Sequence, residues 1–135
     1  MAAIVEESNA ERVRRAHDCF RRGDAEGLAG LCTPDVEFTS FVAEMEGRVY
    51  RGPQGIRDWL ANVEETFDAF SSEVAAIEEL GDRWVLAEIL IRATVGGLPL
   101  EQRAFQLVEL RGDRASRWTW HRTIEEALAA AEEGD

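Results

Sequence analysis

The sequence predicts one α+β domain, with helices in the first half of the chain, a meander of strands after them, and a final helix. Three observations support this prediction. Apolar residues recur at helical spacing in the first half, runs rich in β-forming residues dominate the second half, and no linker or internal repeat interrupts the 135 residues. A chain of this length can bury one sizeable core. We expect residues 8–123 to form the core fold and residues 124–135 a C-terminal helix and tail.

The helices are predicted from their start signals. Ser8 with Glu11 forms a capping box that begins a first helix. Asp24 can cap a short second helix, and residues 33–35 (Thr-Pro-Asp) would end it. Residues 52–55 are expected to form a turn that leads into a third helix. The apolar positions of that third helix follow the i, i+3, i+4, i+7 rule, at Ile56, Trp59, Leu60, Val63 and Phe67.

The strands are predicted from alternation and β-forming content. They cover residues 36–42, 48–51, 73–80, 83–94, 98–110 and 115–122. Gly81-Asp82 and Gly96-Gly97 are expected to form tight hairpin turns between consecutive strands. Thr123 with Glu126 is a second capping box, which begins the last helix at residues 124–133.

The turn at Gly96-Gly97 sorts the strands that it joins into two faces. A two-residue turn places Val95 opposite Leu98, and opposed residues share a face. The more apolar face is expected to lie against the helices and carries Ala87, Ile89, Ile91, Ala93, Leu100, Gln102, Ala104, Gln106 and Val108. The outer face mixes charged and apolar side chains at Leu86, Glu88, Leu90, Arg92, Glu101, Arg103, Phe105 and Leu107.

This half-apolar outer face with paired charges suits a partner sheet, so we expect a homodimer through it. The alternative is a solvated face with ordinary cross-strand pairs, since exposed ion pairs contribute only about 0–1 kcal/mol.

The last strand has two alternative registers. A regular loop after Leu110 would place Arg117, Thr119 and His121 inside, whereas a bulge would place Trp118, Trp120 and Arg122 inside. Burial of two indoles gains several kcal/mol over burial of arginine and threonine, so the bulged register is expected.

Composition and charge exclude several classes of function. A net charge of −12 disfavours binding to a phosphate backbone, so no nucleic-acid partner is expected. No secretion signal or membrane-spanning segment is visible, so no membrane partner is expected. The two cysteines, Cys19 and Cys32, could form a disulfide, but a reduced cytoplasmic setting is the expectation.

The side-chain inventory also limits the chemistry. The chain has no lysine, which excludes Schiff-base catalysis through a lysine. No metal and no cofactor are expected, because the spacing of the two histidines and two cysteines matches no ligand pattern and no glycine-rich phosphate loop is present.

Three stretches carry a resemblance to a known family. They are VRRAHDCFRRGDAEGLAGLCTPDVEF, YRGPQGIRDWL and GDRASRWTWHRTIEEAL, at residues 13–38, 50–60 and 112–128. In this order they resemble the helices, the glycine-led turn and the final strand and helix of the SnoaL-like branch of the nuclear transport factor 2-like superfamily. The resemblance implies a cone-shaped, cystatin-like roll, in which a curved mixed or antiparallel sheet wraps on the N-terminal helices around a conical cavity.

Fold does not decide function in that superfamily, which includes ketosteroid isomerases, polyketide cyclases, limonene epoxide hydrolases, dehydratases and non-catalytic members. The isomerase set implied by the resemblance is not matched. The position of its carboxylate base is Ser40, that of its tyrosine is Ala16, and that of its protonated aspartic acid is Gln106. Serine cannot serve as that base, and alanine donates no hydrogen bond.

The cyclase and epoxide hydrolase sets are not matched either. The cyclases use an acid on the last strand, where this chain has Trp118 and Trp120. The hydrolases use an Asp-Arg-Asp arrangement on inner strand positions, whereas Arg92, Glu101 and Arg103 fall on the outer face.

The remaining pocket candidates are few. His17 is a candidate catalytic acid or base, with a core histidine as the alternative. Tyr50 could aim its hydroxyl into the cavity mouth or only pack there. Gln106 could bind a ligand carbonyl or a water, and Arg122 could hold an acidic ligand or pair with a nearby glutamate. The other residues expected to contact a ligand are Ser40, Trp59, Trp118 and Trp120.

These observations lead to a first hypothesis, a pocket protein for a small apolar or aromatic ligand without a recognisable catalytic set. Two alternatives stay open. One is a cyclase-, isomerase- or dehydratase-like enzyme that uses His17 with Tyr50 or Gln106, and the other is a non-catalytic domain that dimerises through its outer face.

Overall fold

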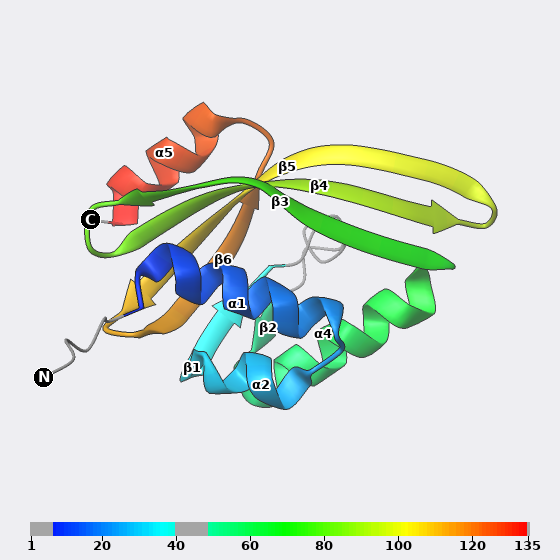
Figure 1. Ribbon diagram of the computed structural model, residues 1–135, viewed down its shortest axis with the longest axis horizontal. Helices are drawn as coiled ribbons and strands as arrows, with labels where there is room; N and C mark the ends of the chain where they lie inside the picture. The colour runs from blue at the N-terminus through cyan, green and yellow to red at the C-terminus, as the bar shows by residue number, and fades with distance from the viewer. Residues whose placement is uncertain (1–6, 40–48, 135) are drawn as a thin grey trace, which may run out of the picture.

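The computed structural model of the chain describes residues 7–39 and 49–134. Its elements in chain order are α1 (Asn9–Arg21), α2 (Ala25–Gly30), β1 (Cys32–Phe38), β2 (Tyr50–Arg51), α4 (Gly52–Thr66), β3 (Ala69–Leu80), β4 (Trp84–Val95), β5 (Leu98–Arg111), β6 (Arg114–His121) and α5 (Ile124–Gly134). The described strands form one curved sheet in the order β2-β1-β6-β5-β4-β3. Helices α1, α2 and α4 lie on one side of this sheet and α5 on the other (Figure 1). The predicted α+β fold is therefore confirmed.

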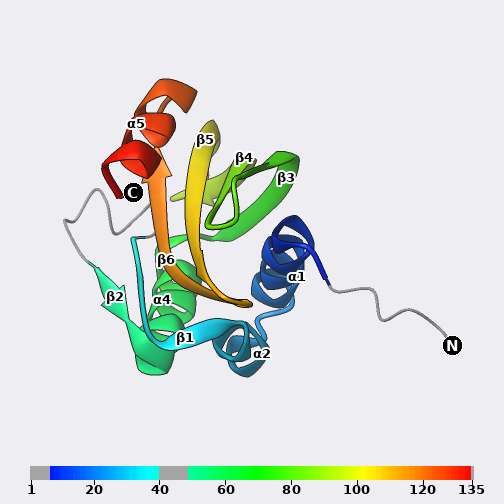
Figure 2. The ribbon, with the colours of Figure 1, turned by 90° about the vertical axis from the view of Figure 1, so that its left-hand side faces the viewer.

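The sheet is mixed, because β1 pairs with β6 in parallel and the other neighbours are antiparallel. Figure 2 shows the strands side by side, with α1 beside the β3 end of the sheet and β2 at the opposite edge. This arrangement follows from the order of elements, since the long β3–β4–β5 meander needs only short hairpins, whereas β1 reaches β6 from far away in sequence.

The predicted helix caps are present. Ser8 Oγ accepts a hydrogen bond from the backbone N–H of Glu11 over 3.1 Å, and Thr123 Oγ1 accepts one from that of Glu126 over 3.1 Å. Asp24 caps α2 through the N–H of Gly27. Residues 52–55 are not a turn before the third helix but its first turn, because a proline is tolerated there, where backbone N–H groups have no partner within the helix.

The first strand lies earlier than predicted. It begins at Cys32, so Pro34 and Asp35 belong to the strand and do not end a helix outside it. A proline fits here because, among the described residues, β1 pairs with β2 only at Glu37 and Phe38 and its register with β6 is interrupted between Cys32 and Glu37. Neither ladder therefore needs the N–H that Pro34 lacks. The later part of the predicted strand, residues 40–42, lies outside the described residues. Of the predicted 48–51 strand, residue 48 lies outside them and Tyr50–Arg51 form β2.

Strand β3 also begins earlier than predicted, at Ala69 instead of Glu73. The added residues pair with the far end of β4, with Phe70 opposite Ala93 and Ser72 opposite Ile91. The alternation of aromatic and small polar residues before Glu73 does not mark a strand by itself, and the pairing with β4 makes it one.

The register predicted from the glycine turn is confirmed. Val95 lies opposite Leu98, Arg92 opposite Glu101 and Glu88 opposite Phe105. Gly96 and Gly97 have φ of 57° and 79°, the left-handed conformation that such a two-residue hairpin turn requires. The turn at Gly81, in contrast, has three residues, because Leu80 pairs with Trp84.

The bulge predicted before the last strand is confirmed as well. The β5–β6 register shifts between Glu109 and Leu110, and it places Trp118 opposite Val108 and Trp120 opposite Gln106. Both indoles therefore share the inner face with Gln106. Ser116, at the bulge on β6, is buried and donates from its hydroxyl to the backbone oxygen and to Oε1 of Glu109.

One part of the predicted outer face is covered within the chain. Leu107 is buried in a cluster with Trp84 and with Ala131 of α5, and Leu86 is buried too. The prediction that the whole outer face is open to a partner is therefore wrong at this end. The C-terminal helix has an apolar face of its own and buries it against β5 and β6.

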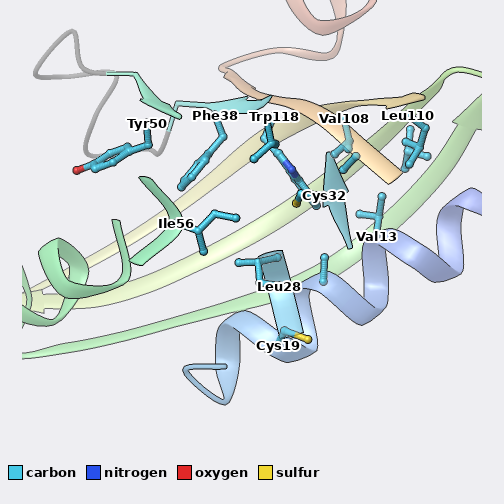
Figure 3. Close-up of a cluster of buried hydrophobic side chains, with 14 residues drawn as sticks. Val13, Cys19, Leu28, Cys32, Phe38, Tyr50, Ile56, Val108, Leu110 and Trp118 are labelled. Atoms are coloured by element: carbon cyan, nitrogen blue, oxygen red, sulfur yellow. The ribbon is translucent and has the colours of Figure 1, made fainter. Parts of the chain in front are cut away.

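The main core lies between the inner face and the helices. Figure 3 shows Phe38 and Trp118, from β1 and β6, on the side opposite Ile56 of α4 and Leu28 of α2. Ile56, Val85 and Val108 are almost completely inaccessible to solvent. Because several of these side chains also border a cavity, the core packing shapes the candidate site.

Candidate functional site

A cavity of about 50 Å³ lies between the inner face of the sheet and the helices. Its residues come from α1, α2, β1, α4, β3, β4, β5 and β6, so segments from most of the chain meet there. The lining residues are Ala16, His17, Phe20, Leu28, Cys32, Phe38, Ile56, Trp59, Phe70, Ser72, Ile91, Gln106, Trp118 and Trp120.

His17 and Gln106 are brought together although 89 residues separate them. His17 projects from the buried face of α1, and Gln106 from the inner face of β5. The distance from His17 Nε2 to Gln106 Oε1 is 2.7 Å, a good hydrogen bond between two side chains that are each more than nine-tenths buried. An amide oxygen only accepts, so the Nε2–H tautomer of His17 donates this bond.

The environment of His17 favours its neutral form. Burial lowers the pKa of His17 below its ordinary value, and the positive charges of Arg21 and Arg14 act in the same direction. The hydrogen bond to Gln106 and the negative charge of Asp18 oppose the shift without reversing it. The Trp118 ring lies near the imidazole in a T-shaped arrangement, with 6.2 Å between the ring centroids, and adds to its apolar surroundings.

One wall of the cavity is built from aromatic rings. Phe20 of α1 stacks on Trp59 of α4 with centroids 4.6 Å apart, and Phe70 of β3 meets Phe20 edge to face. Phe38 of β1 meets the other side of the wall, edge to face against Trp59. Phe20, Trp59 and Phe70 are only half-buried, so this wall separates the cavity from solvent.

The Trp59 indole has an unusual feature. Its Nε1–H is buried and has no hydrogen-bond acceptor among the described residues. A buried donor without an acceptor costs about 1–3 kcal/mol, so a site that retains one calls for an explanation.

The cavity is electrically neutral. Among the described residues, none that lines it carries a carboxylate or a guanidinium group. The described part of the chain also contains no cluster of three or more histidine, cysteine, aspartate or glutamate side chains that could hold a metal ion. Burial raises the pKa of the Cys32 thiol to about 11, so Cys32 contributes a neutral thiol to the lining.

Three residues predicted as ligand contacts lie elsewhere or outside the described residues. Tyr50 is buried in the core, where its hydroxyl accepts a hydrogen bond from Asn62 Nδ2 over 3.0 Å, and it does not line the cavity. Arg122 is exposed beyond β6 and does not line the cavity either; its backbone N–H donates to Glu126 Oε2. Ser40 lies outside the described residues.

The structure adds lining residues that sequence reasoning did not select. Phe20 follows His17 by three residues on the same helix face, and this spacing could have identified it. Phe70 and Ser72 lie on the stretch of β3 that the sequence did not predict as a strand. The alternation Phe70, Ser72, Val74 is visible in the sequence, but only the pairing with β4 shows that it faces inward.

The size of the cavity limits what it can hold in this conformation. An engineered cavity of roughly 150 Å³ accepts benzene, whereas this one is about 50 Å³. A ligand larger than a few atoms therefore requires side chains to move, and those of the aromatic wall are only half-buried.

Comparisons with known proteins agree with the fold. No curated protein matches the chain. Helices long and apolar enough to cross a membrane are absent from the described residues. Among solved structures, the chain is similar to a nuclear transport factor 2-like protein of unknown function from Burkholderia pseudomallei, with 18% identity, 92% of this chain and 97% of that chain covered, and a TM-score of 0.75.

Two further structures of similar fold contain small molecules. TerC co-crystallised with polyporic acid has 22% identity, 93% and 95% of the two chains covered and a TM-score of 0.74. A protein with a ketosteroid isomerase-like fold from Catenulispora acidiphila, in complex with trimethylamine, has 17% identity, 88% and 90% covered and a TM-score of 0.72. At these identities the likeness shows the fold alone. The family model of the SnoaL-like domain matches residues 13–118, most of the chain, and the protein therefore belongs to the SnoaL-like domain family.

Proposed function

We propose that the cavity binds a small, largely apolar or aromatic molecule. The observation that carries this proposal is the lining itself, which combines a continuous aliphatic and aromatic surface with one neutral polar pair, His17 and Gln106. Ligand sites typically have this composition, with a few polar groups that fix orientation in an apolar pocket. Two structures of similar fold contain small molecules, polyporic acid and trimethylamine, which supports the proposal that this fold can hold one.

The test uses the four tryptophans as reporters. Three of them line the cavity, Trp59, Trp118 and Trp120, whereas Trp84 is buried on the outer face. In nitrogen-15 spectra, toluene is expected to shift the indole N–H signals of the three cavity tryptophans and to leave that of Trp84 in place. Signals are assigned with single Trp→Phe variants. Equal shifts at all four indoles, or none up to the solubility limit of toluene, would contradict the proposal.

A second candidate function is acid–base catalysis of the cyclase, isomerase or dehydratase kind. One observation favours it: His17 lines the cavity and is held neutral, so its Nδ1 lone pair is a base in an apolar site. Gln106 is the partner that holds the imidazole, whereas the hydroxyl of Tyr50 is bonded to Asn62 outside the lining.

Proton abstraction can be measured without a known substrate. Cyclohexanone in D₂O exchanges its α-hydrogens when a base removes them, and proton NMR follows the loss of signal. Catalysis predicts that the protein accelerates this exchange and that His17→Gln removes the acceleration, whereas His121→Gln, at the other histidine, retains it. Exchange no faster than in buffer would leave binding as the function.

We further propose a homodimer through the remaining outer face. Leu90 and Phe105 are half-buried there, with Leu90 opposite Arg103 and Phe105 opposite Glu88. The ion pairs Arg92–Glu101 and Arg103–Glu88 lie on the same face. Apolar and paired charged side chains therefore alternate on this face, and a second copy of the same face offers both kinds of partner.

Sedimentation tests this assembly. The wild-type chain is expected to sediment as a dimer at micromolar concentration and Phe105→Glu as a monomer. Leu98→Glu, at a hairpin-tip position that is 73% exposed, is the control and should remain a dimer. A monomeric wild-type chain would refute the proposal.

A further inference from the structure

We propose a second binding site, on the outer side of the sheet, which binds a small organic monocarboxylate through the guanidinium group of Arg117. The site lies in a groove of about 550 Å³ that shares no lining residue with the inner cavity. It therefore goes beyond the ligand proposed for that cavity, and the two sites can be tested separately.

The groove lies toward the edge of the sheet that β2 forms. Its charged lining residues are Asp35, Glu37, Arg51, Glu109, Arg111 and Arg117, and they come from β1, β2, β5 and β6. Figure 2 shows these four strands side by side.

The strand register places Arg117 at the centre of this group. Arg117 is the register partner of Glu37 on β1 and of Glu109 on β5. Glu37 is in turn opposite Arg51 on β2, so positive and negative side chains alternate across four neighbouring strands. They face away from the inner cavity, because Trp118, the residue after Arg117, lines that cavity and successive side chains of a strand point to opposite faces.

Two carboxylates of the groove are paired with arginines of the same groove. Glu37 Oε1 accepts a hydrogen bond from Arg51 Nε over 3.0 Å. Both carboxylate oxygens of Asp35 lie within hydrogen-bond distance of Arg111 Nη2, at 2.8 and 3.0 Å. The positive charges of Arg51 and Arg111 are therefore already balanced.

The third carboxylate, that of Glu109, is paired as well. It is only 7% exposed and accepts hydrogen bonds from Arg83 Nε over 2.8 Å and from Ser116 Oγ over 2.9 Å. Arg117, in contrast, is exposed, and its side chain has no ion pair or hydrogen bond with another side chain among the described residues. Its guanidinium group is thus the charged group of this lining that is left for a ligand.

The charge balance of the groove favours a ligand with one negative charge. Three carboxylates face four guanidinium groups, three from the lining and that of Arg83, so the local net charge is +1. A monocarboxylate neutralises this charge, and its two oxygens match the fork of N–H donors of Arg117. A dianion such as hydrogen phosphate would bring a second negative charge close to three carboxylates without meeting a second unpaired guanidinium group.

The groove is also separate from the part of the outer face proposed for dimerisation. Leu107 lies between Glu109 and Phe105 on the outer face of β5 and is buried in a cluster with Ala131 of α5. The C-terminal helix therefore covers the sheet between the groove and Phe105.

The experiment compares butyrate with butyramide, which have nearly the same shape and differ in charge. Titrations at constant ionic strength follow the arginine Nε–H signals in nitrogen-15 spectra of the wild-type chain. Butyrate is expected to bind about two- to fivefold more tightly than butyramide, the range of one exposed ion pair, and to shift the Arg117 signal most. Hydrogen phosphate is expected to bind more weakly than butyrate.

Two arginine variants assign the binding to one side chain. Arg117→Gln should remove the preference for butyrate, whereas Arg114→Gln should retain it. Arg114 is the matched control because it carries the same charge on the same strand but does not line the groove. Both side chains are exposed, so both variants should keep the fold.

A third variant tests the charge balance through a gain of affinity. Asp35→Asn removes the carboxylate that pairs with Arg111 and raises the local net charge to +2. Butyrate should then bind about two- to fivefold more tightly than to the wild-type chain. Hydrogen phosphate should gain more than butyrate, because a dianion then meets two unpaired guanidinium groups.

Several results would overturn the proposal. Equal affinities of butyrate and butyramide for the wild-type chain, or equal losses in Arg117→Gln and Arg114→Gln, would show that Arg117 forms no site. Tighter binding of hydrogen phosphate than of butyrate by the wild-type chain would show that the groove does not select a single charge. Shifts confined to the cavity tryptophans would place butyrate in the inner cavity. The toluene titration reports on the inner cavity alone, so failure of the groove site and failure of the proposed cavity ligand are distinguishable.

Discussion

His17 is expected to make the stability of the protein depend on pH in a defined window. Burial lowers its folded-state pKa below the ordinary value of 6.5, which is close to the value expected in the unfolded chain. Below pH 6.5 the unfolded chain therefore binds a proton that the folded chain does not. Stability is complete above this pH and decreases as the pH falls, until the folded-state pKa is reached.

The upper limit of the effect follows from this difference. If His17 stays neutral in the folded chain, the free energy of unfolding at pH 5.5 is lower than at high pH by RT ln 11, about 1.4 kcal/mol. The window from pH 7.5 to 5.5 lies above the range in which most carboxylates titrate, so His17 should dominate the change.

Urea unfolding at several pH values measures this dependence. Wild-type stability should decrease by up to about 1.4 kcal/mol across the window, and His17→Gln should lose most of that decrease while remaining less stable at pH 7.5. His121→Gln, at the other histidine, is the control and should retain the decrease. A wild-type chain and a His17→Gln variant with the same pH dependence would show that His17 does not titrate as its burial requires.

Three further predictions concern the packing around the site. Gly55→Ala should destabilise the fold, because a methyl group there would lie 3.0 Å from the backbone carbon of Tyr50. Gly30→Ala has open space around it and should stabilise its helix by about 0.5–1 kcal/mol. Thermal unfolding compares the two variants, and a gain in stability at both positions would contradict the close contact at Gly55. Trp118→Ala should lower the free energy of unfolding by about 3–5 kcal/mol in urea, since the indole is 7% exposed between the sheet and the helices. A decrease below about 1 kcal/mol would show that Trp118 does not face inward. Burial would raise the pKa of Glu109, but hydrogen bonds from Arg83 and Ser116 hold it below the ordinary value, so the contribution of Glu109 to folding stability should be lost as the pH falls through that lowered pKa. Glu109→Gln should reduce this acid-induced loss of stability below pH 4.5, as measured by circular dichroism. An unchanged acid transition in the variant would count against the pairing of Glu109 with Arg83 and Ser116.

Much of the fold was predictable because it depends on local chemistry. The capping residues Ser8, Asp24 and Thr123 begin helices wherever their side chains can reach the next free N–H groups. The Gly96-Gly97 turn determines the pairing of β4 with β5, and with it the face of every residue in both strands. Even the bulge before β6 followed from a comparison of two burial free energies.

The errors lie where distant partners decide the structure. Ser72 is a strand residue because it pairs with β4. Pro34 is one because its position in β1 requires no hydrogen bond from its backbone nitrogen. The covering of Leu107 by α5 was not visible from the sheet pattern, because the same alternation fits a face covered by a partner or by the chain's own helix.

The candidate site divides in the same way. The sequence by itself determined that His17, Gln106 and the tryptophans of β6 face inward, since periods of 3.6 and 2 residues assign faces within one element. Only the tertiary structure decided that His17 bonds to Gln106, that Phe20 closes on Trp59, that Tyr50 lies outside the lining and that the cavity is small. Those facts depend on how elements far apart in the chain pack against one another, and a pattern within a single element contains no such distances.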